Sequence, residues 1–217
     1  MCMIKLKDYS LYLVITEAYA SGKGILNIAK AAIAGGIDIL QMREKDKTQE
    51  ELYKIGGELA KLCRKNKIIF IVNDDPSLVK DIGADGVHIG QSDLIRYSIK
   101  EIRGIIGKNR LIGLSTHSLE QFKQANESDV DYISFGPIFS TKTKDYFIGT
   151  SQIKNVLRIA QKPVVFIGGI NISNLDDILR KGAKNIALIR DILQAEDITL
   201  KAEVFKAKLN IQKLRGF

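Results

Sequence analysis

Three hydrogen-bond donors occupy alternate positions of one short segment. Gln41, Arg43 and Lys45 stand in the run Gln-Met-Arg-Glu-Lys, which follows the apolar residues Ile39 and Leu40. Because side chains alternate between the two faces of a β-strand, these three donors share one side of the chain. Two of them are cations, and such groups bind phosphate oxygens well. The spacing predicts a site for an anionic ligand such as a pyrophosphate, with an ion-paired structural network as the alternative.

Two aspartates follow two further apolar runs and point to a divalent cation. Asp74 comes after Asn73 at the end of Ile68–Asn73, and Asp93 follows Gly86–Gly90. Mg²⁺ in proteins is typically held by one or two carboxylates together with phosphate oxygens and water. Two acids on neighbouring loops beside a cationic cluster therefore predict Mg²⁺ at Asp74 and Asp93. A helix cap is the alternative role for Asp93.

Hydroxyl groups, glycines and two more cations follow the later apolar runs. Hydroxyl and ammonium groups are good phosphate partners, and backbone amides of glycines and helix starts also donate to phosphate. In barrels of alternating strands and helices, the loops after the last two strands commonly bind phosphate. The alternatives are a solvated loop and glycines kept for packing. The candidate substrate site therefore includes Ser115, Thr141, Thr143, Lys144, Gly169, Ile189 and Arg190.

The two histidines also stand near ends of apolar runs. His88 lies within Gly86–Gly90 and is expected to face the interior, as part of a site or as a hydrogen-bonded core residue. His117 follows Ser115 closely and is either a base or, in the favoured interpretation, a residue of the rim.

These polar groups need a fold that gathers many strand ends in one place. Four related phrases, among them Gly36-Ile-Asp-Ile-Leu and Gly83-Ala-Asp-Gly-Val, lead from helical stretches into apolar runs at intervals of about 46 to 53 residues. One strand–helix unit of a barrel takes roughly 25–30 residues, so each interval holds two units. We predict an α/β fold, a single (β/α)8 TIM barrel with residues 1–217 as one domain. The alternative is an open doubly wound sheet, but no Gly-x-Gly-x-x-Gly motif follows the first apolar run.

Periodicity also predicts where the elements lie. Continuous apolar runs are typical of parallel strands covered by helices. The clearest helix is Thr48–Lys65, with apolar residues every three or four positions and with Thr48 and Glu51 as a capping pair. A last helix is expected within Thr199–Phe217. The predicted strands are Leu11–Thr16, Ile39–Arg43, Ile68–Asn73, Gly86–Gly90, Leu111–Ser115, Tyr132–Pro137, Val164–Gly168 and Asn185–Ile189.

Composition narrows the class of protein. The chain has 217 residues, 45% of them hydrophobic, which is enough for a sizeable core. Lysine and arginine number 33 against 25 acidic residues, but they are scattered, so we expect no nucleic-acid partner. The sequence contains no apolar stretch of about 18 residues, so we expect no membrane span, and we expect no secretory signal. Cys2 and Cys63 show no metal or redox spacing. We expect a cytoplasmic protein that binds small phosphorylated molecules, with homo-oligomerisation left open.

Taken in chain order, the motifs resemble one family. They are Leu-Tyr-Leu-Val-Ile-Thr, Gln-Met-Arg-Glu-Lys, Val-Asn-Asp, Gly-Ala-Asp-Gly-Val-His-Ile-Gly-Gln-Ser-Asp, Gly-Leu-Ser-Thr-His-Ser, Phe-Gly-Pro-Ile-Phe-Ser-Thr-Lys-Thr-Lys and Ile-Gly-Gly-Ile. Any one of them is a weak signal, but their order and spacing together are specific. From Leu11 to about Asp197 the chain resembles the thiamine synthase/TenI barrel family, and within it the thiamine phosphate synthases.

The resemblance implies a transferase reaction that needs Mg²⁺. Hydroxymethylpyrimidine pyrophosphate is joined to a thiazole phosphate, giving thiamine phosphate and pyrophosphate, and CO₂ also leaves when the thiazole is carboxylated. The implied route is dissociative: the pyrimidine methylene becomes a cation, which the thiazole nitrogen captures. Such a route requires stabilisation of charge and shielding from water rather than a strong base.

The resemblance also assigns roles to individual residues. The pyrimidine pyrophosphate is contacted by Gln41, Arg43, Lys45, Asn73, Ser115 and Lys144, among which Arg43, Lys45, Ser115 and Lys144 are expected to be catalytic. Asp74 and Asp93 hold Mg²⁺. The thiazole phosphate is held by Thr141, Thr143, Gly169 and the backbone around Ile189, next to Arg190.

Two features depart from the family pattern and keep alternatives open. Arg190 stands where the family usually has serine, and could reinforce or block the phosphate site; the loop from Lys144 to Gly149 looks short. One alternative is a TenI-like thiazole tautomerase in which His117 transfers a proton. Another is a non-catalytic regulatory or carrier barrel that binds thiazole or thiamine phosphate. The synthase is favoured because the chain retains Asn73, Asp74, Asp93 and Lys144.

Overall fold

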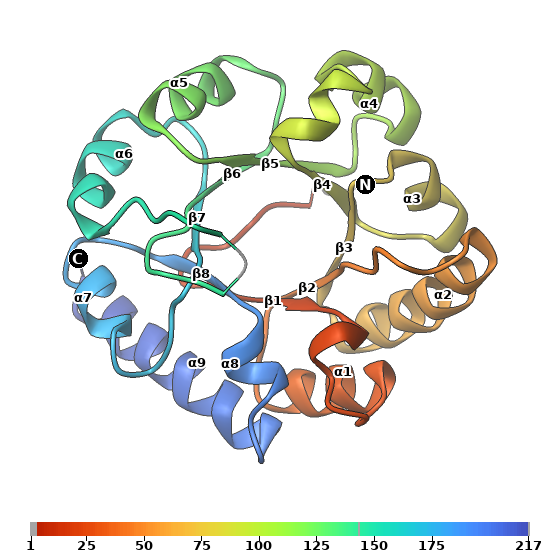
Figure 1. Ribbon diagram of the computed structural model, residues 1–217, viewed down its shortest axis with the longest axis horizontal. Helices are drawn as coiled ribbons and strands as arrows, with labels where there is room; N and C mark the ends of the chain where they lie inside the picture. Colours follow the sequence, from red (N-terminus) through yellow and green to blue (C-terminus); the bar gives the residue numbers. More distant parts are fainter. Residues whose placement is uncertain (1–3, 143, 217) are drawn as a thin grey trace.

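The chain folds into a closed barrel of parallel strands (Figure 1). The computed structural model describes residues 4–142 and 144–216. Each strand pairs with its sequence neighbour, and β8 pairs with β1 to close the ring. The predicted TIM barrel is therefore confirmed. The strands are β1 Leu11–Ile15, β2 Ile39–Met42, β3 Ile69–Asn73, β4 Gly86–Ile89, β5 Leu111–Thr116, β6 Tyr132–Phe135, β7 Val164–Ile167 and β8 Asn185–Leu188.

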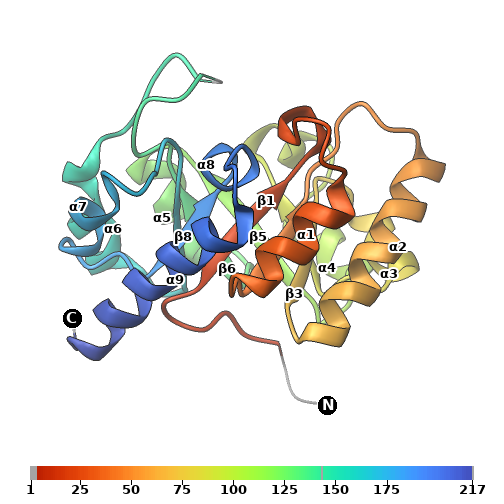
Figure 2. The ribbon, with the colours of Figure 1, turned by 90° about the horizontal axis from the view of Figure 1, so that it is seen from below.

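Helices surround the strands and connect each strand with the next (Figures 1 and 2). The α-helices are α1 Ile25–Ala34, α2 Gln49–Asn66, α3 Pro76–Ile82, α4 Ile99–Ile106, α5 Leu119–Glu127, α6 Ile153–Ile159, α7 Leu175–Leu179, α8 Arg190–Leu193 and α9 Ile198–Leu214. Short 3₁₀ helices are η1 Glu17–Tyr19, η2 Gln91–Ile95 and η3 Thr150–Gln152. In the part of the chain that the structure describes, no helix is both long and apolar enough to cross a membrane.

The predicted strand order is confirmed, but most predicted strand ends need correction by one or two residues. The strands β1, β2, β4, β6, β7 and β8 end before Thr16, Arg43, Gly90, Pro137, Gly168 and Ile189, which were predicted as their last residues. In addition, β3 begins at Ile69, and β5 continues to Thr116. The chain turns into a loop at these points and loses its ladder partners, as at Gly168 with its φ of 99°.

Alternation along the strands separates two apolar layers. In β1, Tyr12 and Val14 point into the barrel, whereas Leu11, Leu13 and Ile15 pack beneath the helices. A barrel of this size is filled by side chains, so a ligand finds room only at one end. The interior layer consists of Tyr12, Val14, Ile39, Ile71, Leu111, Tyr132, Val165 and Ala187.

Capping side chains set where several helices begin. Thr48 and Glu51 form the predicted capping box of α2, which runs to Asn66 rather than Lys65. Asp75 caps α3, and Pro76 occupies its first position. The last helix, α9, begins at Ile198 after its cap Asp197 and ends at Leu214. These caps fix the helix starts that follow the carboxyl ends of the strands.

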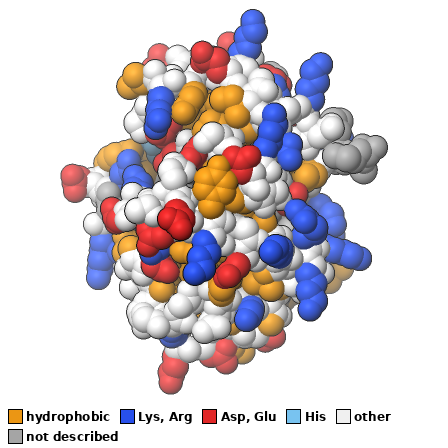
Figure 3. All heavy atoms as spheres, turned by 90° about the vertical axis from the view of Figure 1, so that its right-hand side faces the viewer, with side chains coloured by type: hydrophobic (Ala, Val, Ile, Leu, Met, Phe, Trp, Pro, Cys, Tyr) orange, Lys and Arg blue, Asp and Glu red, His pale blue; other side chains and the backbone are white. Residues whose placement is uncertain are grey.

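The outer surface mixes charges of both signs. Figure 3 shows basic and acidic side chains interspersed over the side of the barrel that lies on the right in Figure 1. Ion pairs on the outside of the barrel, such as Lys208 with Asp176 and Lys184 with Asp8, also bring charges of both signs together. On this face the excess of basic residues therefore does not gather into a single stripe.

Candidate active site

A cavity of about 990 Å³ opens at the carboxyl ends of the strands. Pockets for small molecules usually measure roughly 300 to 1,000 Å³, so two small substrates can share this one. All candidate residues in the described part of the chain line it, whereas Thr143 lies outside the described residues. Those in the lining are Gln41, Arg43, Lys45, Asn73, Asp74, Asp93, Ser115, Thr141, Lys144, Gly169, Ile189 and Arg190.

One wall of the cavity carries the donors of β2 and of the residues that follow it. Gln41 is buried, and Arg43 and Lys45 follow on the same side towards solvent. Glu44 points the other way, where its carboxylate accepts a hydrogen bond of 2.7 Å from the backbone N–H of Glu17. Alternation thus separates the donors that face the cavity from an acid that fastens the wall to η1.

Asp74 and Asp93 form a pair of carboxyl groups beside these cations. Asp74 follows β3 with a left-handed backbone, φ 63°, and its N–H donates to the carbonyl of His88 at 2.8 Å. Burial and, after it, the neighbouring Asp93 carboxyl raise the pKa of the Asp74 carboxyl to about 6, although Lys45 and Arg43 oppose the shift. Two carboxyl groups this close favour either a shared proton or a bound cation.

Asp93 also makes the capping contact that was its alternative role. Its Oδ2 accepts a hydrogen bond of 3.2 Å from the N–H of Gly90, just before η2. A carboxylate offers about four acceptor positions on its two oxygens. One carboxylate can therefore hold this turn and still offer oxygen to a cation.

A hydrogen-bonded network forms the floor of the cavity. The hydroxyls of Tyr12 and Tyr132 are 2.9 Å apart, and that of Tyr132 is 3.0 Å from Nδ1 of His88. On the other edge of the ring, Nε2 of His88 lies 2.9 Å from the hydroxyl of Ser115 and 3.4 Å from that of Ser134. The network links the filled interior of the barrel to a serine that lines the cavity.

Burial fixes the protonation of this network. It raises the pKa of the Tyr12 and Tyr132 hydroxyls well above the ordinary value and lowers the pKa of His88 to about 4. At neutral pH both phenols are protonated and the imidazole is neutral. A neutral imidazole has one donor and one acceptor nitrogen, so it restricts how the Ser115 hydroxyl can point. His88 therefore has the hydrogen-bonded core role that was one of its two interpretations.

Three residues of the floor were not among the candidate site residues: Tyr12, Tyr132 and Gly113, although Tyr12 and Gly113 lie within motifs of the family resemblance. A Cβ atom at Gly113 would lie 2.1 Å from Cζ of Tyr132 and 2.5 Å from Nδ1 of His88, so only glycine lets these rings meet. The signal in the sequence that could have indicated these residues is the alternation of inward and outward positions along the strands. All three occupy inward positions of strands, where a hydroxyl or a missing side chain is unusual.

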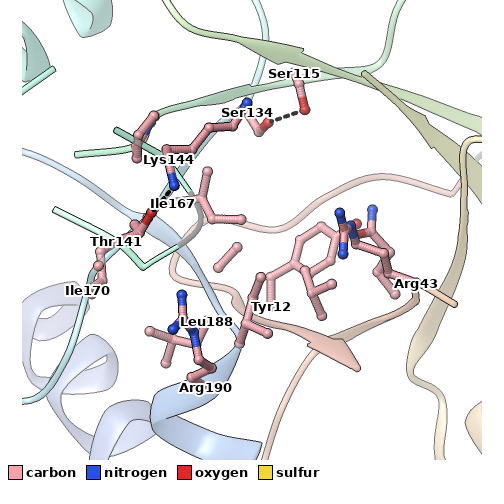
Figure 4. A pocket seen from close by; sticks show the side chains of 18 of the residues that line it. Tyr12, Arg43, Ser115, Ser134, Thr141, Lys144, Ile167, Ile170, Leu188 and Arg190 are labelled. Atoms are coloured by element: carbon pink, nitrogen blue, oxygen red, sulfur yellow. Dashed lines mark hydrogen bonds between the residues drawn. The ribbon is translucent and has the colours of Figure 1, made fainter. Parts of the chain in front are cut away.

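The loop between β6 and η3 forms the opposite wall. Figure 2 shows this loop rising above the strand ends, and Figure 4 shows Lys144 and Arg43 on opposite sides of the cavity. The N–H of Lys144 donates to the hydroxyl of Thr141 at 3.1 Å, which closes a tight turn. Nδ1 of His117 lies 2.6 Å from the carbonyl oxygen of Gly136, where the loop begins. His117 thus fastens the loop at the rim.

The loops after β7 and β8 complete the cavity. At Gly169, φ is 66° and a Cβ atom would lie 2.5 Å from the carbonyl oxygen of Ser140, so a side chain is excluded. The steric requirement considered for this glycine is therefore present. The guanidinium of Arg190 lies 5.0 Å from the ring centre of Tyr19, and Figure 4 shows its side chain pointing into the cavity. The extra cation is held against an aromatic ring.

Comparison with known proteins identifies the family. The family described as Thiamine monophosphate synthase matches residues 11–192. The chain belongs to this family. The thiamine-phosphate synthase of Persephonella marina is 39% identical over 201 residues, which cover 92% of this chain and 95% of the relative. That of Halalkalibacterium halodurans is 35% identical over 207 residues, covering 94% and 97%.

A solved structure agrees with the sequence relatives. Thiamine phosphate pyrophosphorylase from Pyrococcus furiosus superposes with a TM-score of 0.86 at 30% identity, covering 94% of this chain and 96% of that one. The resemblance inferred from the motifs is confirmed. The protein is a transferase that forms thiamine phosphate. The names of these relatives favour the synthase over the tautomerase and the carrier.

Proposed function

We propose that this synthase holds its two substrates in opposite halves of the cavity. The observation that carries the proposal is that Asp74 and Asp93 meet Arg43 and Lys45 in one cavity. A metal ion combined with anionic oxygens matches charges of both signs at once. The pyrophosphate half comprises Gln41, Arg43, Lys45, Asn73, Asp74, Asp93, Ser115 and Lys144. The thiazole half comprises Thr141, Thr143, Gly169, Ile189 and Arg190.

The donor set of the pyrophosphate half fits Mg²⁺. Asp74 and Asp93 supply hard carboxylate oxygens, and the raised pKa of Asp74 reflects its burial and the second carboxyl group beside it. Among the described residues, no group of three or more acids, histidines or cysteines could hold a metal ion by itself. Substrate oxygens and water would therefore complete the coordination, as is usual for Mg²⁺ bound with a phosphate.

The reaction separates charge, and the pyrophosphate half is built to stabilise it. The bond between the pyrimidine methylene and the pyrophosphate oxygen breaks, and both electrons leave with the oxygen. When bound, Mg²⁺ supplies positive charge to the pyrophosphate. Arg43 and Lys45 donate to its oxygens from one wall and Lys144 from the other, while Ser115 donates from the floor in the orientation that His88 sets.

The thiazole half holds the second substrate so that its nitrogen faces the methylene. The lone pair of that nitrogen forms the new C–N bond, so no proton is transferred in this step. The hydroxyls of Thr141 and Thr143 and the backbone at Gly169 and Ile189 bind the phosphate group. When the thiazole is carboxylated, its carboxylate leaves as CO₂; the electron pair of the broken C–C bond stays with the thiazole, which then takes up a proton from water. Arg190 adds a cation at the edge of this half.

We also propose a cytoplasmic location and no nucleic-acid partner. Free Cys63 is buried, which suits a reducing compartment. Basic and acidic residues are interspersed on the face seen in Figure 3, whereas nucleic acid binds a continuous basic surface. Small phosphorylated substrates account for the cations of the cavity.

The test is a product assay on the purified protein. With Mg²⁺ and both substrates, thiamine phosphate and pyrophosphate should form in equal amounts, and chelation of the metal should stop both. Asp93→Asn should lose about 100-fold or more in kcat, a loss typical of removing a preorganised electrostatic group. Asp177→Asn is the matched control, since Asp177 is an exposed acid on α7.

Three other results would contradict the proposal. Conversion of a thiazole tautomer without thiamine phosphate, lost in His117→Ala, would identify a tautomerase. Tight binding of thiazole phosphate with neither reaction would identify a carrier. Full activity of Asp93→Asn would remove the assigned metal site while leaving the family membership intact.

A further inference from the structure

The outward face of α9 carries a regular row of apolar side chains. We call it the α9 row: Leu200, Val204, Ala207, Ile211 and Leu214, spaced by alternating steps of four and three residues. Leu200 is 56% exposed, Val204 38%, Ile211 49% and Leu214 87%. Figure 2 shows α9 on the outside of the barrel. Steps of four and three are the heptad spacing with which one helix packs along another.

A second apolar face of the same helix is already used. The inward residues Ile198, Ala202, Phe205 and Leu209 are buried, where α9 contacts α1 and α8. A surface helix of a globular protein normally has one apolar stripe and an opposite polar face. The fold of a single chain therefore explains the inward face of α9 and leaves the α9 row in water.

We propose that a second copy of this chain covers the α9 row with its own α9, the two helices running parallel. A two-fold axis brings the same patch of both copies together, so the patch must complement itself. The α9 row does so, because apolar side chains at heptad spacing on one helix fit between those on an identical helix. Dimers with a two-fold axis are the commonest oligomers of soluble proteins.

Charges beside the α9 row select both the partner and the direction. Glu203 lies on one flank, and Lys201, Lys208 and Arg215 lie on the other. In a parallel pair, opposite flanks meet, so Glu203 faces Lys208 of the second copy twice in the dimer. In an antiparallel pair, like flanks meet, so the cationic flank of one helix would face the cationic flank of the other, which is unfavourable.

Lys208 can serve this contact without leaving its own chain. Its ammonium lies 2.7 Å from the carboxylate of Asp176 on α7. An ammonium has three donors, so it can hold Asp176 and a glutamate of the second copy together. The inter-copy pair therefore adds to the existing one rather than replacing it.

The size of the surface sets the expected affinity. A stable interface usually buries about 800 Å² per partner, and a helix of this length is about 25 Å long, so α9 supplies only part of that area. A hollow of about 240 Å³ between α7 and α9, lined in part by Ile211 and Arg215, extends the surface beside the α9 row. We expect a reversible dimer with a dissociation constant on the order of micromolar.

Sedimentation equilibrium over a concentration series tests the interface. The wild-type chain should approach twice the mass of one chain. Ile211→Glu should raise the dissociation constant about 100-fold or more, because two like charges would face each other in the seam. Ile95→Glu is the matched control: Ile95 is 91% exposed but lies on η2, away from α9, and its variant should dimerise like wild type. Circular dichroism shows whether both variants fold.

Two outcomes would overturn the interface. One is a wild-type chain that stays monomeric at every concentration. The other is a folded Ile211→Glu variant that dimerises as tightly as Ile95→Glu. The catalytic assay is independent of this result, since the α9 row lies on the outside of the barrel.

Disulfide trapping tests the direction of the helices. In a Cys2→Ser background, Leu200→Cys and Leu214→Cys are prepared separately and oxidised with a copper–phenanthroline catalyst and oxygen, which accept the electrons of the two thiols. A parallel pair brings each position against itself, so each variant should link to itself. Linking only in a mixture of the two variants would show an antiparallel pair and overturn the proposed direction. No linking at all would overturn the interface.

Discussion

The two halves of the cavity are lined by different parts of the chain. In the pyrophosphate half, most of the charged side chains follow strand ends, where Glu44 holds the start of η1 and Asp93 holds the turn at Gly90. In the thiazole half, the loop that follows β6 and the backbone at Gly169 line much of the cavity. Charge that develops during bond breaking is best stabilised by groups that do not have to move. The contrast suggests that the first half carries the chemistry and the second half selects and orients the other substrate.

Lys144 gives the strongest test of this contrast, because it lies on the loop but is assigned to the pyrophosphate. Lys144→Ala should lower kcat about 100-fold, as expected when one donor to a developing anion is lost. Lys142→Ala, on the same loop and also at the cavity, should change kcat only a few-fold. Steady-state kinetics with both substrates decides. Equal losses in the two variants would mean that the loop contributes general positive charge rather than a placed donor.

Gly169 tests whether the thiazole half binds through its backbone. Gly169→Ala adds a Cβ atom beside the carbonyl of Ser140 and strains a positive φ, so the loop must shift. The KM for thiazole phosphate should rise about tenfold while that for the pyrimidine pyrophosphate stays unchanged. Gly22→Ala is the control, because φ there is 75° but no atom lies within 4 Å of the added Cβ. A rise in both KM values would show that the halves are not separate.

Arg190 gives a smaller effect within the same half. If the guanidinium reinforces the phosphate site, Arg190→Ser should raise the KM for thiazole phosphate about fivefold through the loss of one charge-assisted contact. The kcat should change little, since Arg190 is remote from the pyrophosphate in this proposal. A lower KM in Arg190→Ser would instead identify the arginine as an obstruction.

The floor that joins the two halves predicts a pH dependence of stability rather than of activity. The pKa of His88 is about 4 in the folded chain against 6.5 ordinarily, so the unfolded chain takes up the proton first as pH falls. The stability that neutral His88 contributes is complete above pH 6.5 and is lost between pH 6.5 and about 4, by about 3 kcal/mol at most. His88→Gln cannot titrate, so its free energy of unfolding should fall less over this range.

Urea unfolding of both proteins at several pH values measures that difference. The comparison concerns the slope with pH, because replacing a buried ring also lowers stability at every pH. The same slope in His88→Gln as in wild type would show that another group causes the acid sensitivity.

The barrel and most of the candidate site could be predicted because they depend on local patterns. Repeating apolar runs specify the strands, and alternation specifies which donors of Gln41, Arg43 and Lys45 share a face. Strand ends were off by a residue or two at positions such as Pro137, because ladder pairing rather than polarity ends a strand. The roles of the site residues, and residues 1–217 as one domain, stay predictions.

From the sequence alone came the eight strand–helix units, the end of the barrel at which the candidate residues gather, and twelve of the residues that line the cavity. These follow from periodicity and from the rule that strand ends of a barrel converge. The folded structure was needed to see that Asp74 and Asp93 repel each other, and that Tyr12, Tyr132 and His88 form one floor around Gly113. The reason is that these contacts join different strands across a filled interior. Distances and burial there arise only when the barrel closes.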